Sequence, residues 1–202
     1  MKNTTRLALA LALALASSGA HAQDLGYTWL EGGYARVNVD VDGVGDADFD
    51  GITLRGSAQL GVSDFYAVGA LDATRSDDAG ADVDFSAVQG GVGYRYELGS
   101  SVDLISELSL LRVEIDSDGA GDADASGGRI AVGARAVLAD NVEGHVRAHY
   151  TGGGDFDGSF GGAIGAQLRV GDVWGLVAEI ETGELGDGVD VTGVRLGARA
   201  TF

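Results

Sequence analysis

The chain ends with Val191-Thr192-Gly193-Val194-Arg195-Leu196-Gly197-Ala198-Arg199-Ala200-Thr201-Phe202, and this stretch decides the fold. Every second residue from Val194 to Phe202 is apolar, and the residues between them are arginine, glycine or threonine. A period of two residues predicts a β-strand with one apolar face and one polar face. The same kind of alternation recurs nine times upstream, so the sequence predicts an all-β protein.

Ten alternating segments can be assigned along the chain. They span residues 27–39, 50–61, 65–75, 84–96, 101–114, 127–138, 142–152, 158–170, 173–182 and 191–202. Tight turns alternate with longer loops that are rich in glycine and aspartate, near residues 40–49, 76–83, 115–126, 152–157 and 183–190. This asymmetry is typical of outer-membrane barrels, and segments of this length can cross a bilayer when tilted. We therefore expect a transmembrane antiparallel up-and-down β-barrel of ten strands, with eight strands as the fallback and both termini on the periplasmic side.

The apolar face could point into a soluble core or outward into lipid. Aromatic residues gather near the segment ends, as in the girdles of a membrane barrel, whereas a soluble core would hold them centrally. Those near the tight turns are Tyr27, Trp29, Phe65, Tyr66, Tyr94, Tyr96, Trp174 and Phe202, and those near the loops are Phe49, Phe85, Tyr150, Phe156 and Phe160. The arginine-bearing face is rich in glycine, which would leave room for arginine side chains inside a narrow barrel. We therefore expect the apolar face to contact lipid.

The first 22 residues have the three parts of a secretory signal peptide. Met1 to Arg6 is cationic, Leu7 to Ala16 is apolar but too short to span a bilayer, and Ala20-His21-Ala22 is a small-residue cleavage site. Cleavage would leave residues 23–202 as one outer-membrane β-barrel domain, with eleven arginines against thirty-one acids and hence a net charge of −20. Such a charge argues against nucleic-acid binding, and the lack of cysteine excludes disulfides.

The predicted signal peptide, the ten segments and the terminal Phe202 together resemble small outer-membrane β-barrel proteins of Gram-negative bacteria. The stretches Tyr27-Thr28-Trp29-Leu30-Glu31-Gly32-Gly33-Tyr34 and Gly90-Gly91-Val92-Gly93-Tyr94-Arg95-Tyr96 are similar to the Ax21-like group of these proteins. The resemblance implies a place in the cell outer membrane, in contact with its lipid and lipopolysaccharide. It also implies assembly by the barrel assembly machinery, which would read the strand ending in Phe202. It implies no catalytic residues and no cofactor.

The inward face is predicted to carry a network of ionisable side chains. In the two segments of least clear polarity, Glu31 and Asp72 are turned inward because a carboxylate facing hydrocarbon is costly. The expected members are Glu31, Arg55, Asp72, Arg95, Asp103, Glu107, Arg129, Arg135, Glu143, His145, Arg147, His149, Arg169, Glu179, Glu181, Arg195 and Arg199. Eight arginines and seven acids are nearly balanced, so we expect them to pair and fill the interior. The alternative is a narrow, weakly selective pore for small solutes.

Two loops share the pattern D-x-D-G-x-G-D-A-D. Their acids are Asp40, Asp42, Asp46 and Asp48 in the first loop and Asp116, Asp118, Asp122 and Asp124 in the second. Oxygen-rich loops bent by glycine can bind Ca²⁺. The EF-hand pattern fails, however, because Val44 and Gly51 stand where the first loop would need its fifth and twelfth residues as ligands. We expect solvated acidic loops, with weak Ca²⁺ or Mg²⁺ bridging to lipopolysaccharide as a second hypothesis.

An enzyme is the least favoured interpretation. His145 and His149 lie on the same face of one segment, about 13 Å apart, which is too far to share a metal ion. No Ser/His/Asp arrangement can be recognised. An enzyme acting on lipid or peptide is the second alternative function, after the pore. We predict an integral outer-membrane barrel with acidic extracellular loops and an ion-paired lumen, in a structural or interaction role and without enzymatic activity.

Overall fold

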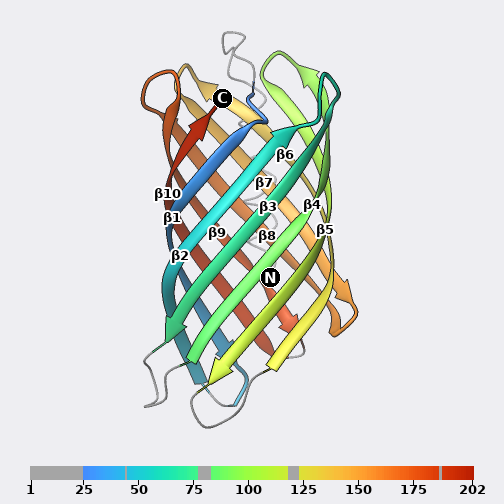
Figure 1. Ribbon diagram of the computed structural model, residues 1–202, viewed down its shortest axis with the longest axis vertical. Helices are drawn as coiled ribbons and strands as arrows, with labels where there is room; N and C mark the ends of the chain where they lie inside the picture. The colour runs from blue at the N-terminus through green and yellow to red at the C-terminus, as the bar shows by residue number, and fades with distance from the viewer. Residues whose placement is uncertain (1–24, 44, 77–82, 118–122, 187) are drawn as a thin grey trace, which may run out of the picture.

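The computed structural model describes residues 25–43, 45–76, 83–117, 123–186 and 188–202. These residues form ten antiparallel strands that close into a single barrel (Figure 1). The strands are β1 (Trp29–Val41), β2 (Gly45–Gln59), β3 (Phe65–Ser76), β4 (Val83–Gly99), β5 (Val102–Ser117), β6 (Ala123–Ala139), β7 (Val142–Gly153), β8 (Phe156–Arg169), β9 (Trp174–Gly186) and β10 (Val189–Thr201). The all-β barrel and the count of ten strands, rather than eight, are confirmed.

The C-terminal stretch that predicted the fold closes the barrel. β10 pairs with β1 in a register that runs from Trp29 opposite Thr201 to Val41 opposite Val189. Every other strand pairs with its neighbours in the sequence, as an up-and-down topology requires. We call the end of the tight turns, where β1 begins and the chain ends, the turn side, and the opposite end the loop side (Figure 1).

The two faces of the sheet point as predicted, with aliphatic side chains outside and charged ones inside. Leu110 and Ile52 are 76% and 70% exposed on the outer surface, whereas Glu31 is only 4% exposed inside. An aliphatic outer band is the surface that a bilayer covers in a barrel of this kind. No described helix has the length and apolar character needed to span a membrane. The predicted signal peptide, residues 1–22, lies outside the described residues and stays a prediction.

Several strands extend farther toward the loop side than expected. β2 begins at Gly45 rather than near residue 50, and β6 begins at Ala123 rather than near residue 127. The alternation continues through the aspartates, since Val37, Val39 and Val41 of β1 pair with β2 residues. The first predicted loop therefore shrinks to a tight connection after Val41. Gly43 adopts a φ of 78° there, a conformation that glycine accepts without strain.

The assignment of all terminal aromatics to outer girdles was wrong for five of them. Phe65, Tyr96, Trp174, Phe160 and Phe202 are more than half exposed on the outer surface, as predicted. The aromatics that instead face the interior are Tyr27, Trp29, Phe49, Tyr66 and Phe85. For the four that lie in strands the reason is parity, because a residue two positions from an inward-facing residue in a regular strand also faces inward. Tyr27 precedes β1, so parity does not apply to it.

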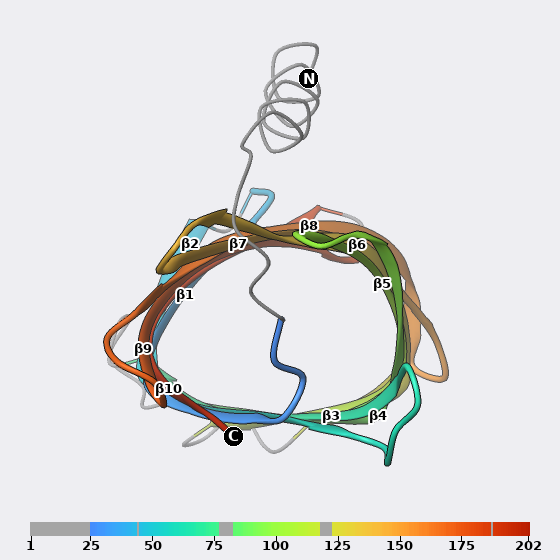
Figure 2. The ribbon, with the colours of Figure 1, turned by 90° about the horizontal axis from the view of Figure 1, so that it is seen from above.

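The segment before β1 enters the barrel instead of leaving it. Seen from the turn side, the chain just before β1 runs from the wall of the barrel into its opening (Figure 2). Leu25 and Tyr27 are buried there, 6% and 3% exposed. They form a small apolar cluster with Tyr66, Ile105 and Val137. The turn side of the lumen is therefore filled by chain as well as by side chains of the strands.

Candidate functional site

The lumen contains a carboxylate, Glu179 on β9, that contacts four basic side chains. Arg147 Nη2 lies 3.1 Å from Oε2 of Glu179, and Arg55 Nη1 lies 3.6 Å from Oε1. Arg195 donates a hydrogen bond to Oε1, and His145 Nε2 is hydrogen-bonded to Oε2. The four partners come from three other strands, β2, β7 and β10. Glu179 therefore links opposite walls of the barrel at mid-height.

A second group of charges lies one step toward the loop side, around Glu181. Arg195 Nη2 is 2.6 Å from Glu181 Oε2, and Arg129 Nη1 is 3.2 Å from Glu181 Oε1. His149 Nε2 lies 3.7 Å from the same Oε1. Arg195 thus bridges the two glutamates that alternate on the inner face of β9. Charge-assisted contacts of this kind are among the stronger hydrogen bonds in proteins.

A third group occupies the turn side. Arg199 donates hydrogen bonds from Nε and Nη2 to Glu31 Oε2, at 2.9 and 2.6 Å. Its Nη1 donates to Gln167 Oε1 at 3.0 Å. Glu143 accepts a hydrogen bond of 3.0 Å from Arg135 and another from Arg169. The charges of this group are thus satisfied by side chains of β1, β6, β7, β8 and β10.

The segment before β1 is attached to these charges. Arg135 Nη1 donates a hydrogen bond of 3.1 Å to the carbonyl oxygen of Gly26. The Arg135 guanidinium carbon lies 4.6 Å from the ring centroid of Tyr27, and that of Arg95 lies 5.2 Å from it. A guanidinium over an aromatic face is attracted by the ring quadrupole. The inward segment is therefore anchored by both its backbone and its aromatic ring.

All seventeen of the side chains assigned to the lumen from the sequence face the interior of the barrel, and each is less than a quarter exposed. Fifteen of them belong to the three groups or contact them. Arg95 instead pairs with Asp64 and Glu97 at the turn side, at 3.4 and 3.2 Å. Asp72 makes a 3.9 Å contact with Arg55, and Asp103 accepts its hydrogen bond from Tyr27.

Several members of the network were not predicted from the sequence. Tyr27 and Tyr66 donate hydrogen bonds to Asp103 and Glu107, at 2.9 and 3.0 Å. The Trp29 ring lies 3.9 Å from the guanidinium carbon of Arg199. Trp29 could have been placed from parity, because it lies two residues before the inward-facing Glu31. No sequence signal shows that Tyr27, which precedes the first strand, turns inward.

Several inward-facing glycines make room for rings, whereas the sequence predicted room for arginines. A Cβ built on Gly161 would lie 2.3 Å from His149 Nε2, and one on Gly165 would lie 2.5 Å from His145 Cε1. A Cβ on Gly93 would lie 2.2 Å from Cζ of Tyr66. Gly133, whose Cβ would lie 2.9 Å from Cγ of Arg147, does match the expectation. Missing side chains on one strand thus accommodate bulky planar groups from its neighbour.

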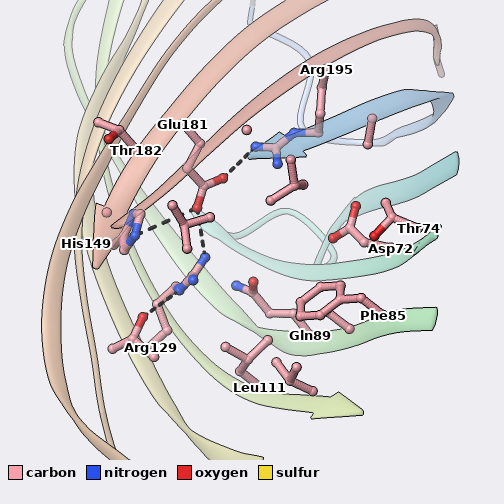
Figure 3. A pocket seen from close by; sticks show the side chains of 18 of the residues that line it. Asp72, Thr74, Phe85, Gln89, Leu111, Arg129, His149, Glu181, Thr182 and Arg195 are labelled. Atoms are coloured by element: carbon pink, nitrogen blue, oxygen red, sulfur yellow. Dashed lines mark hydrogen bonds and ion pairs between the residues drawn. The ribbon is translucent and has the colours of Figure 1, made fainter. Parts of the chain in front are cut away.

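The loop-side half of the lumen differs from the turn-side half. It contains a cavity of about 130 Å³ (Figure 3). Its walls include a ring of apolar side chains, formed by Val37, Phe85, Leu111, Val113 and Val191, which we call the apolar collar. Below the collar lie charged residues of the network, among them Arg55, Asp72, Arg129, Glu181 and Arg195. A simple alternation, with apolar residues outside and polar residues inside, predicts a lumen that is polar throughout. The lumen is instead apolar at the collar.

The acids that were assigned to two loops lie mostly on strands. Asp40, Asp46, Asp48, Asp116 and Asp124 belong to the loop-side ends of β1, β2, β5 and β6, and Asp42 lies in the turn after β1. Asp118 and Asp122 lie outside the described residues. Asp48 accepts hydrogen bonds from Arg36 and Asn38, at 2.6 and 3.0 Å. Across the described part of the chain, no three His, Asp or Glu side chains gather as a metal site.

Solved outer-membrane barrels share this architecture. The beta domain of the Bordetella autotransporter Brka aligns with a TM-score of 0.56 at 16% identity, over 89% of this chain and 100% of that one. The translocator domain of the autotransporter NalP from Neisseria meningitidis aligns with a TM-score of 0.54 at 13% identity, over 100% of this chain and 98% of that one. Ail of Yersinia pestis aligns at 19% identity with a TM-score of 0.47, over 89% and 100%. At identities this low, the two autotransporter alignments, whose TM-scores exceed 0.5, show a shared fold alone.

A comparison with curated proteins gives no match. The family model described as outer membrane protein beta-barrel domain, by contrast, matches residues 7–202 of this chain. The match includes all ten strands, from the first to the strand that closes the barrel. Proteins of this family lie in the outer membrane of Gram-negative bacteria, and so does this one. The chain belongs to the outer membrane protein beta-barrel domain family.

Proposed function

We propose that this protein is a closed barrel with a structural or interaction role at the cell surface, and that it does not conduct solutes. The single observation that carries the proposal is the filling of the turn side of the lumen. Leu25 and Tyr27 are buried inside the opening, and the Glu31–Arg199 and Glu143–Arg135 pairs line its wall, each joining two adjacent strands. The remaining space is small, with adjoining cavities of about 130, 70 and 60 Å³. A lumen filled in this way leaves the outer surface and the loop side available for function.

Planar-bilayer conductance tests this proposal. The purified protein should insert without steady open channels. Folding is verified independently by heat-modifiable mobility on an unboiled SDS gel, so that a silent bilayer is not attributed to an unfolded protein. The alternative function is a narrow, weakly selective pore, and steady single-channel steps from the inserted wild-type protein would favour that alternative and overturn the closed barrel.

Contact with lipopolysaccharide is supported by a row of charges on the outer surface. Arg36, Asp50, Arg75, Asp84 and Asp116 stand opposite one another in successive strand pairs from β1 to β5. The side chains of the first four are about half exposed, and they lie at the loop-side ends of the strands. Arginine suits bidentate binding of phosphate, and carboxylates suit Ca²⁺ or Mg²⁺ that bridges to it. An Arg36→Gln/Arg75→Gln variant should retain less lipopolysaccharide through purification than the wild-type protein; equal retention would contradict the contact.

The C-terminal strand is proposed to serve as the signal for the barrel assembly machinery. Phe202 is 78% exposed, and its N–H donates a hydrogen bond of 2.9 Å to the carbonyl oxygen of Thr28. The strand thus presents an aromatic side chain outward at its end. A Phe202→Ala variant should fold in detergent but assemble less efficiently in cells, and normal surface levels would remove this role.

No enzymatic role is proposed. Glu179 and Glu181 are the acids beside His145 and His149, and both acids also contact arginines. Among the described residues, neither histidine is hydrogen-bonded to a serine, threonine or tyrosine hydroxyl. A general base needs such a group within hydrogen-bond reach to activate a nucleophile. Hydrolysis of lipid A or of peptide by the purified protein would contradict this proposal.

A further inference from the structure

The cavity on the loop side combines apolar walls with a polar floor. Val37, Leu111 and Val113 line the cavity as part of the apolar collar. Phe85 lines it too, and its ring lies beside Gln89 (Figure 3). Asp72, Arg129, Glu181 and Arg195 lie on the floor. A mainly apolar pocket with a few convergent polar groups is the usual form of a small-molecule site.

Three polar atoms around this cavity have no hydrogen-bond partner among the described residues. They are Arg55 Nε, Asp72 Oδ1 and Thr74 Oγ1. All three atoms are buried, and their residues line the cavity. Thr74 itself is only 6% exposed. They comprise a donor, an acceptor and a hydroxyl that can act as either. Buried polar groups are nearly always hydrogen-bonded, so an unpartnered set at one wall points to a ligand that completes it.

The charges at the floor are balanced, which excludes an ionic ligand as the preferred one. Arg55 lies within ion-pair distance of Asp72 and Glu179, at 3.9 and 3.6 Å. Arg195 contacts Glu179 and Glu181, and Arg129 contacts Glu181. Arg147 contacts Glu179 as well and also Glu107, so four guanidinium groups face four carboxylates. An anion or a cation entering this site would have to displace an existing partner, whereas a neutral group would not.

The size of the cavity limits the ligand. Its volume is about 130 Å³. An apolar cavity of about 150 Å³ in another protein accommodates benzene. A ligand with a single six-membered ring therefore fits, with its ring against the apolar collar and one polar group at Thr74 and Asp72. A hydroxyl group can donate to Asp72 Oδ1 while it accepts a hydrogen bond from Arg55 Nε.

We propose that the loop-side cavity is a binding site for a small neutral alcohol or phenol with one six-membered ring. The apolar collar holds the ring, and the wall formed by Arg55, Asp72 and Thr74 holds the hydroxyl group. The site lies on the loop side of the filled part of the lumen. Ligand binding there does not depend on whether the lumen conducts solutes.

The test is a titration of the detergent-solubilised barrel with cyclohexanol, followed by the NMR shifts of the Leu111 and Val113 methyl groups. Saturable shifts are expected with cyclohexanol, and not with cyclohexane or methyl glucoside at the same concentration. Thr74→Val, which keeps the shape but removes the hydroxyl, should weaken binding about tenfold. Thr192→Val is the matched control, because Thr192 is exposed on the outer face of β10, and it should bind like the wild type.

Each other outcome overturns the proposal. Saturation by cyclohexane to the same degree would mean that the unpartnered polar atoms do not recognise the ligand. Binding of methyl glucoside without binding of cyclohexanol would mean that the collar does not select an apolar ring. Shifts that never saturate, or that Thr74→Val leaves unchanged, would mean that water alone satisfies the three atoms. Asp72→Asn provides a second variant, expected to weaken binding, and an unboiled gel verifies that each variant is folded.

Discussion

The hydroxyl of Tyr27 donates a hydrogen bond of 2.9 Å to Oδ2 of Asp103, although 76 residues separate the two in the sequence. Both side chains are buried, 3% and 4% exposed. Tyr27 precedes the first strand, whereas Asp103 lies at the start of β5, about halfway along the strand order. The contact therefore spans the lumen and makes the segment before β1 part of the packed interior of the barrel.

Tyr27→Phe should destabilise the barrel, because it removes the hydroxyl and leaves the buried Asp103 carboxylate without that donor. Loss of one partner from a buried hydrogen bond costs about 1–3 kcal/mol. The measurement is the free energy of unfolding in urea, in detergent micelles. Tyr96→Phe is the matched control, since Tyr96 is 58% exposed on the outside, and it should change stability little. Equal effects of the two substitutions would mean that the inward contact contributes nothing.

Glu179→Gln should destabilise the protein far more. The amide keeps the shape of the side chain but removes the charge that Arg55, Arg147 and Arg195 share. Removing one partner from a buried ion pair typically costs about 3–5 kcal/mol. The measurement is again the urea midpoint in micelles, read together with heat-modifiable mobility.

The control for Glu179→Gln is Glu97→Gln. Glu97 also contacts an arginine, with 3.2 Å between its Oε1 and Nη2 of Arg95, but its side chain is 61% exposed. Exposed ion pairs contribute about 0–1 kcal/mol. A Glu179→Gln variant as stable as Glu97→Gln would refute the central role of Glu179.

Parity explains which parts of this structure could be predicted from the sequence. Alternation assigns each strand residue to one face. Together with the cost of a carboxylate in lipid, which decided Glu31 and Asp72, it placed all seventeen ionisable side chains inside the barrel. Trp29 and Phe85 were misplaced because their position near strand ends was given more weight than their parity. Trp29 shares a face with Glu31, and Phe85 shares one with Gln89. A consistent use of parity would have corrected both.

The partners inside the lumen could not have been predicted in the same way. Parity gives the face of a residue but not its height in the barrel, which depends on strand tilt and on the stagger between strands. Glu179 meets Arg55 and Arg147 from strands that are not its neighbours in the sheet. The inward course of Leu25 and Tyr27 lies outside any strand, so no periodic pattern describes it.

Leu110→Arg tests which face contacts the bilayer. Leu110 lies near the middle of β5 and is 76% exposed. An arginine on the lipid face near the bilayer midplane costs about 2–4 kcal/mol, whereas one in water costs little. The expected result is a loss of that size in reconstituted bilayers. Val62→Arg, in the tight turn after β2, is the control and should be neutral; a neutral Leu110→Arg would indicate that this face contacts water.

Gly93→Ala tests whether glycines shape the lumen by making room for rings. A Cβ at residue 93 would lie 2.2 Å from Cζ and 2.4 Å from Cε2 of Tyr66, both on a ring that is held by its hydrogen bond to Glu107. Overpacking of this kind typically costs about 1–3 kcal/mol. Gly90→Ala, on the outer face of the same strand, has no heavy atom within 4 Å of the new Cβ and should be neutral or slightly stabilising.

A double-mutant cycle completes the test of Gly93. Tyr66→Leu removes the ring that the new methyl group would strike, so Gly93→Ala should cost much less in that background than in the wild type. Neighbours that share a contact show such non-additivity, whereas independent sites add within about 0.5 kcal/mol. Strict additivity would mean that the cost arises from the backbone of β4 itself. In that case glycine would be required at this position for strand geometry and not for the space it leaves to Tyr66.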